Sequence, residues 1–106
     1  MIKIQIFRGF EGRISGYAVT GHSGTAARGE DIVCAGVSVL AETALLGIGK
    51  QLHRQVDYRV ASGDLYVSLK ELPDEHSDVL LETMLLGMRE IEKAYPKAVR
   101  ISEVRR

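Results

Sequence analysis

The chain has 106 residues, of which 45% are hydrophobic and 26% charged, as is typical of one globular domain spanning 1–106. Its 14 Lys and Arg balance its 14 Asp and Glu, which argues against a protein that grips phosphate backbones. The single cysteine excludes an intramolecular disulfide and favours a reducing, cytoplasmic location. We expect no signal peptide, and no apolar run approaches the length that crosses a bilayer, so no membrane partner is predicted.

Two β-strands are predicted at the N-terminus. Ile2, Ile4 and Ile6 alternate with polar residues, so they share one face of a strand. A second extended stretch covers residues 14–20, where Gly16 indicates a bulge or a close approach of another backbone. A turn rich in glycine separates the two stretches, which predicts a hairpin.

A loop and a helix follow. Residues 21–30 show no apolar period, which predicts a loop, and their glycines are Gly21, Gly24 and Gly29. Asp31 is a favoured N-cap residue, because its carboxylate can accept hydrogen bonds from the first-turn amides. Apolar residues then recur at helical spacing to about Leu52, namely Val33, Val37, Leu40, Ala44 and Ile48.

The second half predicts a hairpin, a helix and a last strand. Residues 55–61 and 65–70 alternate on either side of a Ser-Gly-Asp turn. Asp74 or Ser77 caps the second helix, and Pro96 ends it. Its expected core positions are Leu81, Met84, Leu85, Met88, Ile91 and Tyr95. With a final strand near residues 99–101, the order is β-β-α-β-β-α-β. This order predicts an α+β fold with a mainly antiparallel sheet covered by two helices, in a strand order that stays open.

Cys34 and His22 are the candidate reacting groups. Cys34 lies in the first turn of the predicted helix, where exposed amides and the helix dipole favour negative charge and hence a thiolate. His22 lies 12 residues earlier, across a loop long enough to bring its imidazole to the sulfur. Such a pair performs nucleophilic catalysis, with histidine as base and then acid. Residue types and spacing alone leave a second interpretation open, in which Cys34 is a small core residue and His22 an ordinary loop residue.

The sequence around these residues resembles a known family. Gly-His at 21–22, a glycine-rich connector and GEDIVCAGVS at 29–38 closely resemble the signature of the bacterial ribosomal-processing cysteine proteases. The resemblance covers the whole chain. It implies a cysteine endopeptidase that removes a short N-terminal extension from the large-subunit ribosomal protein numbered twenty-seven and so supports ribosome assembly. By position, His22 and Cys34 match the catalytic dyad of the family, which also suggests a homodimer.

Neighbouring residues have supporting roles in this prediction. Asp31 either orients His22 or only caps the helix. Ser38, one turn after Cys34, either contacts substrate or bonds a backbone carbonyl. First-turn amides, including that of Cys34, are candidate oxyanion donors, and the loop 21–30 is expected to close over an extended peptide.

Two positions differ from the resembled pattern. Ser23 stands where alanine is common, and Gly36 indicates a close approach by substrate or by a neighbouring element.

The same residues bear on three further interpretations. Residues 21–24 fit the Gly-x-x-Gly loop of KH modules, so a non-catalytic RNA-binding or ribosome-assembly module is the alternative function. That loop joins two helices in KH domains, whereas here it follows a strand, and we expect no direct nucleic-acid partner. A thiol redox protein would need Cys34 but not His22. The histidines have no zinc-ligand spacing relative to Cys34, so no metal or other cofactor is expected.

Overall fold

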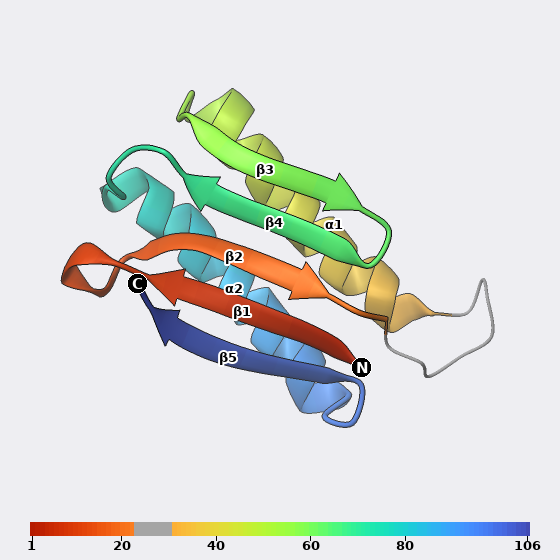
Figure 1. Ribbon diagram of the computed structural model, residues 1–106. Helices are drawn as coiled ribbons and strands as arrows, with labels where there is room; N and C mark the ends of the chain where they lie inside the picture. Colours follow the sequence, from red (N-terminus) through yellow and green to blue (C-terminus); the bar gives the residue numbers. More distant parts are fainter. Residues whose placement is uncertain (23–30) are drawn as a thin grey trace.

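The computed structural model describes residues 1–22 and 31–106 and confirms the predicted α+β fold class and order of elements (Figure 1). The strands are β1 (Ile2–Arg8), β2 (Ile14–Thr20), β3 (Val56–Ala61), β4 (Asp64–Leu69) and β5 (Val99–Arg105). The helices are α1 (Ile32–Leu46) and α2 (Glu75–Ala94). A 3-10 turn, Phe10–Gly12, joins β1 to β2, and a π-helical segment, Gly47–Gln51, continues α1.

The five strands form one sheet in the order β3-β4-β2-β1-β5. The two hairpins are antiparallel, and β2 also runs antiparallel to β4. Only β5 departs from this pattern among the described strands, because it lies parallel to β1, with Ile2 opposite Val99. The chain reaches that edge through α2, which starts near the end of β4 and carries the chain across the sheet (Figure 1).

Both helices cover the same face of the sheet, and the core lies between the two layers (Figure 1). The fully buried residues of α1 follow a period of 3.6 residues through 33, 37, 41, 44 and 48, and Leu40 is half-buried and packs against this core. One predicted core position of α2 is wrong. Tyr95 is 40% exposed, because α2 ends one residue before it.

Both candidate caps of α2 take part in its start. The Asp74 carboxylate accepts from the Ser77 amide at 2.9 Å, and the Ser77 hydroxyl accepts from the Asp74 amide at 2.9 Å. This reciprocal arrangement satisfies two amides that the first turn would leave unpaired.

Gly16 is a point of close backbone approach, as predicted. A β-carbon added there would lie 2.5 Å from the carbonyl oxygen of Val67 on β4. The register of β1 against β2 shifts between Phe7 and Arg8, beside this point. Glycine therefore allows β2 to pair on both sides while the strand bends.

The helical stretch Ile32–Gln51 is long and apolar enough, by length and composition, to cross a membrane. The expectation that no run approaches this length is therefore wrong. The same stretch places Val33, Val37 and Ile48 in the core against the sheet. Packing thus explains the apolar residues on the buried face of this stretch, and the absence of a membrane partner stays a prediction.

Candidate active site

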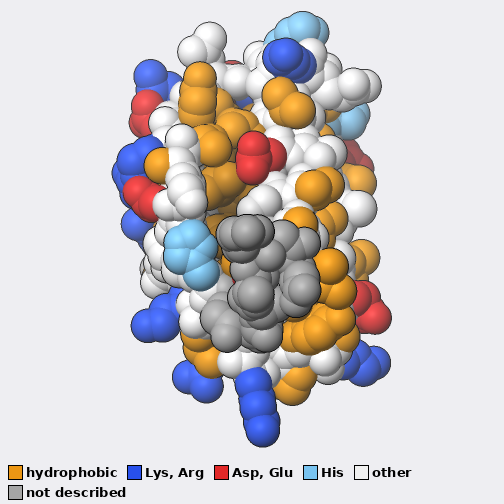
Figure 2. Space-filling model, turned by 90° about the vertical axis from the view of Figure 1, so that its right-hand side faces the viewer, with side chains coloured by type: hydrophobic (Ala, Val, Ile, Leu, Met, Phe, Trp, Pro, Cys, Tyr) orange, Lys and Arg blue, Asp and Glu red, His pale blue; other side chains and the backbone are white. Residues whose placement is uncertain are grey.

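A pocket of about 350 Å³ lies between α1 and the β3–β4 hairpin, at the end of the molecule where β2 ends and α1 begins. Figure 2 faces this end and shows a hollow between the sheet side and the helix side, with hydrophobic side chains on its floor. Four predicted site residues line the pocket, namely Gly21, His22, Cys34 and Ser38. Residues that are distant in sequence are thus brought to one cavity.

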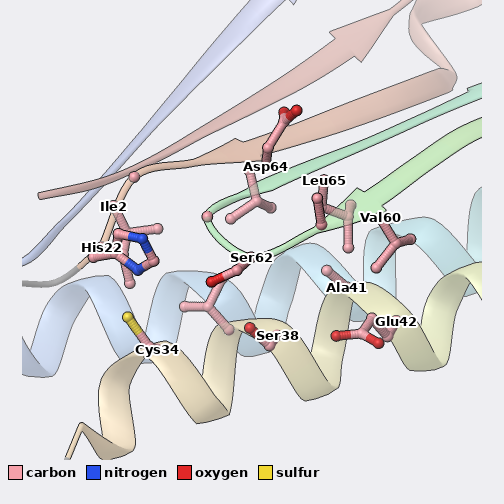
Figure 3. A pocket seen from close by; sticks show the side chains of 15 residues that line it. Ile2, His22, Cys34, Ser38, Ala41, Glu42, Val60, Ser62, Asp64 and Leu65 are labelled. Carbon is pink, nitrogen blue, oxygen red and sulfur yellow. The ribbon is translucent and has the colours of Figure 1, made fainter. Parts of the chain in front are cut away.

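Cys34 is the third residue of α1 and is partly buried. Asp31 is the N-cap, as predicted, and one of its carboxylate oxygens accepts from the Cys34 amide at 2.9 Å. The bond fixes the first turn and directs the thiol into the pocket (Figure 3).

The same hydrogen bond corrects one expectation. The amide of Cys34 is a predicted oxyanion donor, yet in the structure it donates to Asp31. An oxyanion in the pocket would have to compete with a carboxylate for this proton. The Cys34 amide is therefore engaged in capping rather than aimed at a substrate.

His22 reaches the pocket from the opposite wall. Gly21, whose φ of 88° is in the left-handed region, turns the chain after β2 and precedes His22. The Gly21 amide donates to the carbonyl oxygen of Gly63 at 3.0 Å, which ties this turn to the β3–β4 hairpin. Figure 3 shows the imidazole and the Cys34 sulfur pointing toward the same space. The predicted pair is therefore assembled across the pocket.

Ser38 and Glu42 follow Cys34 on the same face of α1, one and two turns along, and both line the pocket (Figure 3). Glu42 is a lining residue that the sequence analysis missed, although its spacing of four from Ser38 was a usable signal. The sequence also did not predict that the β3–β4 hairpin forms the facing wall of the pocket, because no local pattern indicates what a hairpin packs against. From it, Asp64 lines the pocket, and a hydrogen bond from Arg59 at 2.8 Å lowers the pKa of the Asp64 carboxyl.

Other predicted positions lie elsewhere. Ser23, Gly24, Gly29 and the closing-loop prediction lie outside the described residues. Gly36 faces α2, because a β-carbon there would lie 3.2 Å from the Ile91 side chain, so the close approach is by a neighbouring element. Within 1–22 and 31–106, no group of three His, Cys, Asp or Glu side chains is arranged to hold a metal ion.

A thiol at a helix start that faces an imidazole across a cleft defines the site of a thiol hydrolase. The family model described as Cysteine protease Prp matches residues 1–100. The chain belongs to this family of ribosomal-processing cysteine proteases.

Curated relatives match nearly end to end. The ribosomal processing cysteine protease Prp of Staphylococcus aureus (strain NCTC 8325 / PS 47) is 26% identical over 105 residues, which cover 96% of this chain and 98% of that protein. The Bacillus subtilis (strain 168) protein of the same name is 29% identical over 112 residues, with 96% of each chain covered.

Solved structures agree with this assignment. The crystal structure of the S. aureus protease with a covalently linked product peptide has a TM-score of 0.90 at 25% identity, covering 97% of this chain and 99% of that one. A second structure of that protease, with a substrate peptide, has a TM-score of 0.85 at 24% identity and the same coverage. The fold and the enzyme class of this chain are thereby confirmed.

Proposed function

We propose that this cysteine protease uses Cys34 as its nucleophile and His22 as its general base and acid. The observation that carries the proposal is the placement of the two side chains on opposite walls of one pocket, facing the same space (Figure 3). The two residues come from different elements, so their convergence is a property of the fold. Family membership supplies the reaction class, and this geometry supplies the candidates for it.

The reaction is acyl transfer. His22 takes the thiol proton while the Cys34 sulfur bonds to the scissile carbonyl carbon. The carbon–nitrogen bond then breaks, His22 gives the proton to the departing amine, and a thioester remains. Water adds to the thioester carbon with His22 again as base, which releases the acid and restores the thiol.

The proposed substrate is an N-terminal extension of the large-subunit ribosomal protein numbered twenty-seven. Supporting this are the relatives' function in ribosomal processing and the product peptide bound covalently to the S. aureus protease. The pocket fits an extended peptide with apolar side chains, because Ile2, Val19 and Leu65 contribute to its lining beside the reacting pair. Removal of the extension would support ribosome assembly.

The direct test is incubation with the extended ribosomal protein, followed by intact-mass measurement of the products. We expect a single mass loss that corresponds to the N-terminal segment. Cys34→Ala and His22→Ala should both abolish it, with unchanged circular dichroism. His76→Ala is the matched control, because His76 is exposed and does not line the pocket. Full processing by either site variant would overturn the residue assignment, and an unchanged substrate mass with the native enzyme would overturn the substrate.

We also propose that the enzyme is a homodimer that acts in the cytoplasm. Apolar side chains that are at least half exposed flank the groove between the outer faces of α1 and α2, and they are Val39, Leu46, Val79 and Leu86. A second copy of the chain would cover them. Light scattering should give the mass of two chains, and Leu86→Glu should halve it. A native mass of one chain would overturn the dimer, and fractionation of cells that places the protein outside the cytoplasm would overturn the location.

A further inference from the structure

The imidazole of His22 lies directly against the backbone of Gly63, in the turn between β3 and β4. A β-carbon added at Gly63 would lie 2.7 Å from Nε2 and 3.0 Å from Cε1 of His22. Carbon atoms of a folded protein do not approach a ring so closely without a shift of one or the other. The missing side chain of Gly63 is therefore the space that the imidazole occupies.

The backbone just before His22 is also held in place, by contacts with the β3–β4 turn and with the start of β1. The Gly21 amide donates to the Gly63 carbonyl oxygen at 3.0 Å, so the residue before His22 is bonded to the residue beneath its ring. A β-carbon at Gly21 would lie 2.4 Å from the Met1 carbonyl oxygen, so the turn is also confined by the start of β1. The hairpin therefore contacts both the backbone before His22 and the ring itself.

We propose that Gly63 is a positioning residue that orients His22 toward Cys34. The inference rests on the proposed function, in which His22 is the base. Cys34 is fixed by its cap on α1, whereas His22 is fixed from the opposite wall by the hairpin (Figure 3). The distance and angle between the two reacting groups are thus set by how the β3–β4 turn packs.

Gly63 has a second reason to be glycine, namely its φ of 71°, which strains most residues that have a side chain. Gly12 separates the two effects. Its φ of 75° is nearly the same, but a β-carbon there would meet nothing within 4 Å. Gly12→Ala thus carries the backbone strain alone, and Gly63→Ala carries the strain and the collision with His22.

The test compares Gly63→Ala with Gly12→Ala and His22→Ala in three measurements. These are kcat and KM for processing, thermal unfolding, and the pH dependence of Cys34 alkylation by iodoacetamide. We expect Gly63→Ala to lower kcat by about 10- to 100-fold, as small misplacements of a catalytic group do, with KM little changed. Its alkylation profile should move to that of His22→Ala. Gly12→Ala should lower the melting temperature less than Gly63→Ala does, because it lacks the collision, and it should keep native kcat and a native profile.

Two outcomes separate this inference from the proposed function. If His22→Ala is inactive but Gly63→Ala keeps native kcat and a native alkylation profile, the positioning role is wrong and the base assignment stands. If His22→Ala keeps its turnover, both are wrong. Should Gly63→Ala not fold, Gly63→Asn carries the same comparison, because Asn tolerates positive φ yet still places a β-carbon at the ring. In the His22→Ala background either substitution should lower the melting temperature less, and an equal loss in both backgrounds would overturn the contact.

Discussion

The hydroxyl of Tyr17 donates a hydrogen bond to the backbone carbonyl oxygen of Ala41 at 2.8 Å, in the fully buried core. Tyr17 is on β2, the strand that leads to His22, and Ala41 is on α1, the helix that begins just before Cys34. This bond therefore joins the two elements that carry the proposed reacting pair. It fixes how the helix lies on the strand, whereas the β3–β4 hairpin fixes the imidazole locally.

Tyr17→Phe should destabilise the protein by about 1 kcal/mol, because it removes this bond while it keeps the ring in the core. Urea unfolding at pH 7 measures the loss. A free energy of unfolding equal to that of the native protein would contradict the interpretation that the bond contributes to stability.

The same variant should change how stability depends on alkaline pH. Burial raises the pKa of Tyr17 well above its ordinary value, so the folded state holds the phenol proton more tightly than the unfolded state does. This contribution is complete below about pH 10 and is lost as the pH rises beyond it, by at most about 1.4 kcal/mol per pH unit. We expect native stability to fall more steeply than that of Tyr17→Phe between pH 9 and 11. Parallel curves would contradict the prediction.

Asp31 should stabilise the protein because it is the N-cap of α1. Asp31→Ala should cost about 1 kcal/mol, whereas Asp31→Asn should cost little, because Asn caps a helix nearly as well. Urea unfolding of both variants checks this. We further expect Asp31→Asn to keep its turnover, since the cap that holds Cys34 is retained. Lost turnover at native stability would instead show that the carboxylate itself orients His22.

Glycine has opposite effects at two positions, which alanine substitution should reveal. Gly16→Ala should destabilise by about 1–3 kcal/mol or more, because its β-carbon would meet the backbone oxygen of Val67, which cannot move without disturbing β4. Gly49→Ala should stabilise by about 0.5–1 kcal/mol, because it is helical and its β-carbon would meet nothing within 4 Å. Thermal unfolding measures whether the melting temperature of each variant rises or falls. A change in the same direction for both variants would contradict this prediction.

Asp74 should contribute to the acid sensitivity of the fold. The Ser77 amide, followed by the side-chain hydrogen bond from Arg54, holds the pKa of Asp74 below its usual value. Because the carboxyl pKa is lower in the folded state, ionised Asp74 adds stability above about pH 4. This stability is lost as the pH falls through the pKa of the folded state. Asp74→Asn keeps the cap but cannot titrate. Its melting temperature should therefore fall less than the native one between pH 5 and 2, and identical profiles would contradict the role.

Local features of the chain were largely predictable from the sequence. Alternating isoleucines identified β1, and Asp31 correctly predicted the start of α1, because capping and periodicity involve neighbours a few residues apart. The pair His22 and Cys34 was predicted from residue chemistry and a family signature. The prediction that Tyr95 belongs to the core was wrong, because α2 ends one residue before it and its side chain is 40% exposed.

The pattern of residues along the chain was enough to predict the strands and helices, their order and the residues able to react. Three features became known only from the folded chain: β5 lies parallel to β1, the Cys34 amide donates to the Asp31 carboxylate, and Gly63 provides the space for the His22 ring. The difference lies in how far apart in sequence the interacting residues are. Caps and periodic faces arise between near neighbours, whereas strand pairing and the contact of Gly63 with His22 join residues that are distant in sequence. Such contacts depend on how every element packs at once, so no local pattern specifies them.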